Sequence, residues 1–121
     1  MIPDREVREI TVRALVDTGA GTLVINEAVR QQLGLEIKGL RRGTLADGAR
    51  QVYQVTEPVE LRWKDRESTC RALVLPDAEE ILLGLIPLED MDLVVDPIAR
   101  ELKGAHGNEV FCMIKALRGL P

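Results

Sequence analysis

An acid, a hydroxyl and two small residues follow directly after an apolar strand pattern near the start of this chain. Residues 10–16 alternate between apolar and other side chains and lead into Asp17, Thr18, Gly19 and Ala20. A carboxylate at the end of a buried strand costs free energy unless hydrogen bonds hold it. Thr18 can supply a hydroxyl, and Gly19 lets the backbone approach closely because it has no Cβ. These residue types suit acid–base chemistry at Asp17.

Acid–base hydrolysis of an amide needs more than one such carboxylate. One carboxylate cannot at the same time activate a water molecule and protonate a leaving amine, whereas two that share a proton can. Two carboxyl groups held close together cannot both ionise, so the pKa values of the pair split. Asp47 and Asp77 lie beside turns but lack the strand-Asp-Thr-Gly context of Asp17. A symmetric dimer would supply the second Asp17.

A second apolar strand pattern, Ile81–Leu83, ends in Gly84. Together with Asp17–Ala20, this segment resembles the retropepsin-like aspartic proteases, the small family that includes retroviral proteases and their bacterial relatives. The resemblance covers about residues 10–98. It implies a mainly β half-barrel with one or two short helices, and an apolar segment that crosses under the Asp17 loop. It also implies a homodimeric endopeptidase, in which one aspartate per subunit activates a shared water without a covalent intermediate.

The same resemblance assigns roles to the residues that follow the catalytic Asp17. Thr18 would form a hydrogen bond across the twofold axis and hold the two loops together. Gly19 would offer its carbonyl oxygen to a peptide or protein substrate, and Ala20 would line the floor of the site. No metal and no cofactor is implied.

A hairpin is predicted over residues 43–55, since Asp47-Gly48 is among the strongest hairpin turn signals. In the family that the chain resembles, the hairpin at this point is the flap that closes over substrate, which would place Ala46, Asp47 and Gly48 at its tip. An ordinary surface hairpin is the alternative interpretation. The basic residues 41–42 are interpreted as solvated charge, with contact to a substrate or partner as the alternative.

Two positions depart from the retroviral pattern. Gly21 stands where retroviral members commonly carry a second acid, and Leu85 stands where they commonly carry an arginine. These two charges normally pair to brace the dimer, so this brace is missing. The sixteen residues before Asp17 are also few for a terminal dimer strand plus a first hairpin, and residues 109–115 are an alternative interface strand. A catalytically silent peptide-binding or dimerisation module of the same fold is therefore the alternative function.

Composition limits the remaining possibilities. A length of 121 residues predicts one domain over residues 1–121, and 45% hydrophobic residues with a single Trp, Tyr and Phe predict a core of Val, Leu, Ile and Ala. A net charge of −4 argues against nucleic acid as a partner. No apolar run reaches the roughly 18 residues of a membrane span. No secretory leader pattern is present, so a cytoplasmic location is expected.

Weaker constellations have simpler interpretations. Cys70 and Cys112 have no metal-ligand spacing, and two buried thiols are favoured over a disulfide. Asp90, Asp92 and Asp96 suggest a metal site, but an acidic helix start and a strand end explain them more simply.

Two helices are predicted among the short strands. One spans residues 27–33, with Asn26 as its N-cap and Gly34 as its C-terminal stop. One or two helical turns are predicted over residues 87–92, with the proline near the helix start and acids in the first turns. The segment Leu35–Arg42 gives no clear pattern. With few parallel crossovers, the strands predict a mainly β fold with barrel-like closure.

Overall fold

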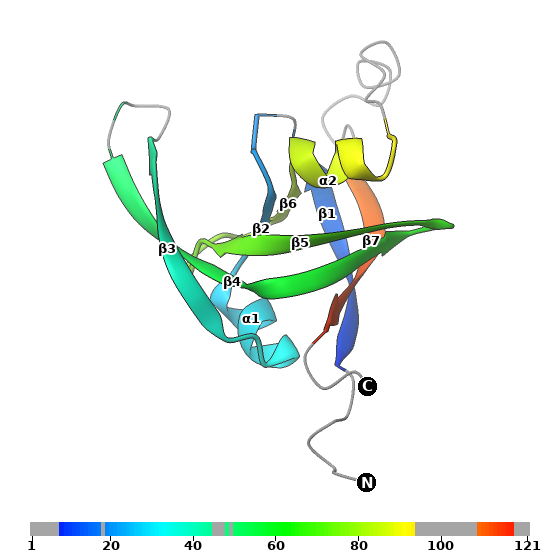
Figure 1. The fold of residues 1–121 in the computed structure, drawn as a ribbon, viewed down its shortest axis with the longest axis horizontal. Helices are drawn as coiled ribbons and strands as arrows, with labels where there is room; N and C mark the ends of the chain where they lie inside the picture. The colour runs from blue at the N-terminus through cyan, green and yellow to red at the C-terminus, as the bar shows by residue number, and fades with distance from the viewer. Residues whose placement is uncertain (1–7, 18, 45–47, 49, 94–108, 118–121) are drawn as a thin grey trace, which may run out of the picture.

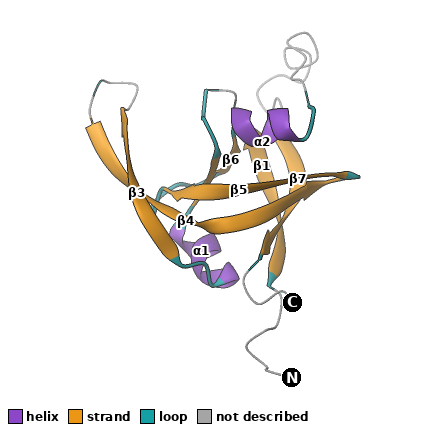
Figure 2. Ribbon diagram, viewed as in Figure 1, coloured by secondary structure: helices purple, strands orange, loops and turns teal. Residues whose placement is uncertain are grey.

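The computed structural model describes residues 8–17, 19–44, 48, 50–93 and 109–117 (Figure 1). The described residues form a mainly β fold, as predicted, with two short helices (Figure 2). In chain order the elements are β1 (Glu9–Val16), β2 (Leu23–Ile25), α1 (Glu27–Leu33), β3 (Ile37–Thr44), β4 (Arg50–Trp63), β5 (Arg66–Val74), β6 (Ile81–Leu83), α2 (Leu85–Asp90) and β7 (Glu109–Ala116).

The strands form one sheet that closes on itself. Their order is β3-β4-β5-β2-β6-β1-β7, and an additional pairing of β4 with β7 joins the two ends into a ring. β3 lies outside this ring and extends the sheet along β4 as a hairpin, which projects away from the other strands (Figure 1). The predicted half-barrel, with its retropepsin-like arrangement of strands, is confirmed.

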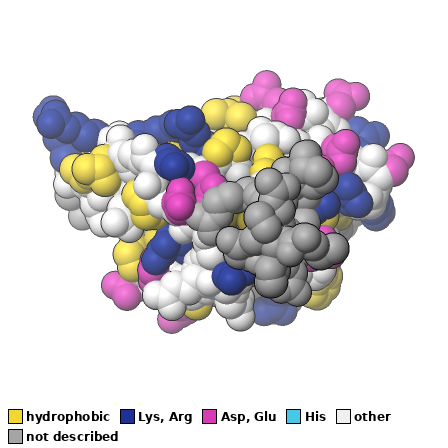
Figure 3. All heavy atoms as spheres, turned by 60° about the horizontal axis from the view of Figure 1, so that its bottom comes forward, with side chains coloured by type: hydrophobic (Ala, Val, Ile, Leu, Met, Phe, Trp, Pro, Cys, Tyr) yellow, Lys and Arg dark blue, Asp and Glu magenta, His cyan; other side chains and the backbone are white. Residues whose placement is uncertain are grey.

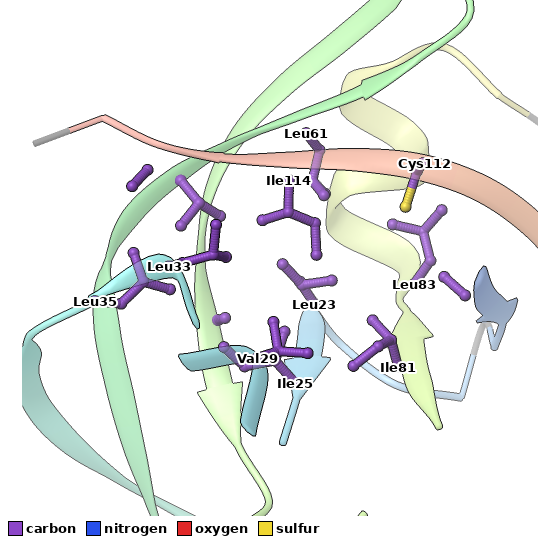
Figure 4. Packing of buried hydrophobic residues seen from close by; sticks show 14 of the residues in the cluster. Leu23, Ile25, Val29, Leu33, Leu35, Leu61, Ile81, Leu83, Cys112 and Ile114 are labelled. Carbon is purple, nitrogen blue, oxygen red and sulfur yellow. The ribbon is translucent and has the colours of Figure 1, made fainter. Parts of the chain in front are cut away.

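Branched aliphatic side chains fill the inside of the ring. Alternate residues of each strand point inward, because successive side chains of a strand lie on opposite faces of the sheet. The large side chains that are almost fully buried come from α1, the loop after it and most strands, and include Leu23, Ile25, Leu33, Leu35, Leu61, Leu83 and Ile114 (Figure 4). The core is aliphatic, as the shortage of aromatic residues predicted.

α1 begins and ends where the sequence predicted. The Asn26 side chain accepts a hydrogen bond from the backbone N of Val29 at 2.9 Å, and Gly34 has a left-handed φ of 66°. Val29 and Leu33 are buried one turn apart and seal one end of the core. Among the described residues, no helix has the length and apolar character needed to cross a membrane.

The hairpin is longer than predicted on its first arm. β3 begins at Ile37, so most of the segment for which the sequence gave no clear pattern is strand. Glycines and exposed charges hide its alternation, and pairing with β4 decides its conformation.

β4 is one strand of 14 residues with an irregularity near its middle. The register with β5 shifts between Val55 and Pro58. The Thr56 hydroxyl accepts a hydrogen bond from the backbone N of Ala72 at 3.1 Å and donates one to the Glu57 carbonyl at 2.7 Å. This buried side chain replaces a ladder hydrogen bond that the shift removes.

β7 is built into the ring of its own chain. It pairs with β1 from Glu109 to Lys115, and its second half also pairs with β4, up to Arg62↔Met113. Residues 113–115 therefore have partners on both edges, and the expectation that residues 109–115 form a strand for a second subunit is wrong for that half. The first half, which carries the exposed Phe111, is paired along one edge within the described residues.

Replacing Asn26 by Ala is expected to destabilise the protein by about 1 kcal/mol or more, since both the helix cap and a tertiary contact are lost. The Asn26 amide nitrogen also donates to the Ala78 carbonyl at 3.1 Å. Asn26→Asp keeps the cap acceptor and removes only the second bond, so it should unfold between Asn26→Ala and wild type in urea. Equal midpoints for all three proteins would contradict the cap.

Candidate active site

Asp17 lies at the end of β1, where the strand turns away from the sheet. Its backbone N donates to the Leu83 carbonyl at 3.0 Å, and its carbonyl accepts from Ala20 N at 3.0 Å. Its carboxylate oxygen Oδ1 accepts a hydrogen bond from Gly19 N at 2.9 Å. Within the described residues, Oδ2 has no hydrogen-bond donor. The half-buried carboxylate is therefore held by one oxygen and can meet a water molecule with the other.

The segment that follows β6 passes directly against this loop. A Cβ on Gly84 would lie 2.7 Å from the Ala20 carbonyl oxygen and still closer to that of Thr22. Beyond the glycine, Leu85 N donates to the Ala20 carbonyl at 2.9 Å, and Ile86 N donates to the Gly21 carbonyl at 3.0 Å. The expected crossing of the apolar-apolar-Gly segment under the Asp17 loop is present, and only glycine fits it.

The same hydrogen bonds correct the prediction for the second helix. α2 spans Leu85–Asp90, so it starts two residues before the predicted proline and ends before Asp92. The helix has no acid in its first turn, and no side chain caps it. The loop carbonyls accept from the first N–H groups instead, a tertiary arrangement that the local sequence does not encode. Glu89 and Asp90 lie at the helix end, so an acidic helix start does not explain them.

A row of registered apolar side chains crosses the sheet on the face opposite the core. Residues directly opposite each other on paired strands project to the same face. The row runs from β4 to β1 through Val55, Leu73, Val24, Leu82 and Leu15. Three of these side chains, those of Leu15, Leu73 and Leu82, are half-buried, so the row forms a partly accessible apolar floor.

Asp17 follows the strand that carries the last residue of this floor. Side chains two positions apart on a strand share a face, so Arg13 and Leu15 project the same way, and Asp17 comes two positions after Leu15, directly beyond the end of β1. The apolar row therefore begins beside the carboxylate and leads away from it across the sheet. This arrangement suits an extended ligand with apolar side chains and a reactive group at Asp17.

A pocket occupies each end of the row. One, of about 60 Å³, is lined by Arg13, Leu15, Glu79 and Glu80. The other, of about 250 Å³, lies between the β3–β4 hairpin and the Asp17 side of the sheet, and we call it the hairpin pocket. Its lining includes Arg41 and Val55 from the hairpin, Arg71 and Leu73 from β5, and Thr22 and Ile86 from the loop and α2.

The two cysteines do not add a second reactive group. Both are free thiols, as predicted; Cys112 is buried, and Cys70 is half-buried beside the hairpin pocket. Burial raises the pKa of each thiol to about 11. Because only the thiolate is a strong nucleophile, both side chains stay protonated and unreactive near neutral pH.

The remaining predicted site residues divide into described and undescribed positions. Gly19 is exposed and Ala20 is half-buried, both in the Asp17 loop. A Cβ on Gly19 would lie 3.1 Å from Asp17 Oδ1, so glycine leaves room for the carboxylate. Gly48 has a left-handed φ of 85°, which suits a tight turn. Three positions, Thr18, Ala46 and Asp47, lie outside the described residues.

The described acidic residues near α2 do not form a metal site. In the described part of the chain, no group of three or more His, Cys, Asp or Glu side chains is placed to hold a metal ion. Asp92 has a left-handed φ of 58°, and its backbone N donates to the Glu89 carbonyl at 2.9 Å as the chain leaves α2. Asp96 lies outside the described residues.

The comparisons with known proteins agree with this geometry. A family model described as "gag-polyprotein putative aspartyl protease" matches residues 4–90. The chain belongs to this retropepsin-like aspartyl protease family. The matched region contains the Asp17 loop, the hairpin and the crossing segment at Gly84. No curated protein matches the chain.

Sequence reasoning missed most of the floor and the hairpin pocket. The role of Leu15 could have been predicted, because alternation along β1 puts it on the face opposite the core, two positions before Asp17. Arg71, Leu73 and Ile86 carry no local signal, since their positions depend on the pairing of strands that are far apart in the chain. The loop and the crossing segment were found because each has a compact sequence pattern.

Gly84→Ala is expected to destabilise the protein by at least the ~1–3 kcal/mol typical of overpacking, because the new Cβ meets backbone atoms that cannot rotate away. Gly21→Ala is the matched control in the same loop, where an added Cβ has no atom within 4 Å. Thermal unfolding of both variants decides the point. A Gly84→Ala midpoint equal to that of Gly21→Ala would contradict the close crossing.

Proposed function

We propose that the protein is a homodimeric aspartic endopeptidase with Asp17 of each subunit as the catalytic acid and base. One observation carries the proposal: the Asp17 carboxylate stands at the end of an apolar floor, on a loop locked by the Gly84 crossing. Membership of the aspartyl protease family supports it. A lone subunit holds one such loop within the described residues, so the second carboxylate comes from a second copy.

The chemistry follows from two aspartates that share one proton. The ionised carboxylate takes a proton from water as the water oxygen attacks the peptide carbonyl carbon. The protonated carboxyl group gives its proton to the carbonyl oxygen, forming a tetrahedral diol. Collapse of the diol breaks the C–N bond, and a carboxyl group supplies the proton that the departing nitrogen needs. The apolar floor holds the substrate chain while these protons move.

Exposed apolar side chains beside the Asp17 loop support a dimer at this place. Leu85 and Ile86 are 42% and 57% exposed, and both are hydrogen-bonded through their backbones to the loop. Apolar side chains clustered on a surface are typical of protein interfaces. In a twofold dimer each subunit presents the same patch. Contact between the Leu85 side chains of the two subunits would then replace the acid–arginine pair that braces the dimer in the retroviral pattern.

The β3–β4 hairpin is proposed as the flap over the bound chain. Arg41 pairs with Tyr53, so these side chains share a face of the hairpin with Val55. That face lines the hairpin pocket together with Thr22 and Ile86 from the Asp17 side. The hairpin and the loop therefore form opposite walls of one depression, the position that a closing flap occupies.

Asp17→Asn is expected to keep the fold and lower peptidase activity by about 100-fold or more, because the amide cannot exchange the catalytic proton. Asp77→Asn is the control, since Asp77 is an exposed turn residue that is not part of the Asp17 loop. Hydrolysis of a peptide library by wild type and both variants, with circular dichroism to check folding, tests the proposal. Equal activity in wild type and Asp17→Asn would assign the activity to another site or to a contaminant.

Leu85→Asp is expected to weaken the dimer by about tenfold or more, since the twofold axis brings two like charges together. Leu40→Asp is the control, because Leu40 is 71% exposed on the outer face of the hairpin. Sedimentation velocity over a range of concentrations measures both. Wild-type protein that stays monomeric at the highest concentration would remove the shared site and favour the catalytically silent peptide-binding module.

A further inference from the structure

We propose that the hairpin pocket binds an acidic side chain of the substrate and that Arg41 and Arg71 select it. This inference rests on the proposed function, because it assigns the substrate preference of that site. It arises from the charged residues at the two ends of the apolar row. Glu79 and Glu80 lie with Arg13 at one end. Arg41 and Arg71 lie at the other, without an acid among the described lining residues.

Two arginines, Arg41 and Arg71, line the hairpin pocket, and none of its described lining residues is acidic. Arg41 and Arg71 form no ion pair within the described residues. Both side chains are exposed, so they do not bury charge and remain available to a ligand. A planar guanidinium with several N–H donors matches a carboxylate in geometry as well as in charge.

The strand pairing fixes both arginines toward the pocket. Arg41 shares the inner face of the hairpin with Val55, while its neighbour Arg42 pairs with Val52 on the outer face. Arg71 lies two positions before Leu73 on β5, and its carbonyl accepts a hydrogen bond from the Thr22 hydroxyl at 3.1 Å. Figure 3 shows Lys and Arg side chains gathered over the end of the hairpin.

The pocket has the size and apolar lining for one amino-acid side chain. A volume of about 250 Å³ is smaller than the ~300–1,000 Å³ of most small-molecule sites. Val55, Leu73 and Ile86 provide apolar walls for the methylene groups of a Glu side chain, and Arg41 and Arg71 line the same pocket and can pair with its carboxylate. An isolated small anion would leave these apolar walls unused.

The pocket is also continuous with the route to Asp17. Val55 and Leu73 both line it and form the first two members of the apolar row. Three strand spacings separate Leu73 on β5 from Leu15 on β1. Since strands lie ~4.8 Å apart and an extended chain rises ~3.3 Å per residue, this distance corresponds to roughly four substrate residues. The acidic residue is therefore expected a few positions from the cleaved bond. A twofold dimer repeats the preference on the other side of that bond.

The test uses octapeptide libraries that differ only in carrying Glu, Gln or Lys at one fixed position, moved along the peptide in turn. Wild type should prefer Glu to Gln by about tenfold in kcat/KM at one position on each side of the cleaved bond. Arg41→Met and Arg71→Met should each lose this ratio, mainly through KM. Arg41→Lys should keep part of it, and Arg41→Glu should favour Lys peptides. Raising the salt concentration should lower the wild-type ratio.

Arg42→Met is the matched control, because it removes the adjacent positive charge from the outer face of the same strand. It should keep the wild-type preference. An equal loss in Arg42→Met and Arg41→Met would show a general charge effect and overturn the pocket assignment. A wild-type enzyme that cleaves Glu and Gln peptides equally at every position would also overturn it.

Binding separates this inference from the proposed function. Fluorescence anisotropy with labelled peptides and the Asp17→Asn protein measures selection without hydrolysis. Selective binding of Glu peptides that needs Arg41, in a protein whose wild type cleaves nothing, keeps the pocket and rejects the peptidase. Cleavage without charge preference keeps the peptidase and rejects the pocket. Absence of both cleavage and Glu-selective binding rejects both.

Discussion

The structure depends on the close contact between Gly84 and the backbone of the Asp17 loop. Two segments far apart in the chain meet there without a side chain between them, and their amides and carbonyls satisfy one another. The contact fixes the end of β1, starts α2 and leaves one carboxylate oxygen of Asp17 facing outward. Because backbone hydrogen bonds and steric exclusion act together, the loop has little freedom to adjust. In the proposed dimer, a carboxylate that shares a proton with its symmetry mate needs this rigidity.

The ring of strands supplies the rest of the geometry through register. One face of each strand packs the aliphatic core, and the other face carries the apolar row that ends beside Asp17. A shift of one residue in any pairing would move these side chains to the wrong face. Core stability and the order of side chains along the floor are therefore set by the same pairings. The hairpin and β5 add charge where the row ends, while Glu79 and Glu80 lie at its other end.

Local patterns in the sequence predicted the elements that depend on local chemistry. Asn26 and Gly34 marked both ends of α1, and the Asp17 loop and the Gly84 crossing were recognised from short motifs. The start of α2 was misplaced because its first amides bind carbonyls of a loop more than 60 positions earlier. Arg41 on β3 and Arg71 on β5 reach the same pocket because both strands pair with β4, which residue spacing does not reveal. Prediction therefore succeeded where one segment decides the structure and failed where partners decide it.

The irregularity in β4 gives that strand two mechanical parts. Residues 50–56 pair with β3 in the hairpin, and residues 59–62 pair with β7 and close the ring. The ladders on both sides resist bending, but both shift register here, at a point that Thr56 ties to β5. The shifts lie between Val55 and Pro58 on the β5 side and between Ile37 and Gly39 on the β3 side. The hairpin therefore extends from the closed ring as a separate part, joined to it at this irregularity. In the proposed peptidase, bending at this point would change the width of the depression above the apolar floor, while the pairings that hold Asp17 in place would stay unchanged.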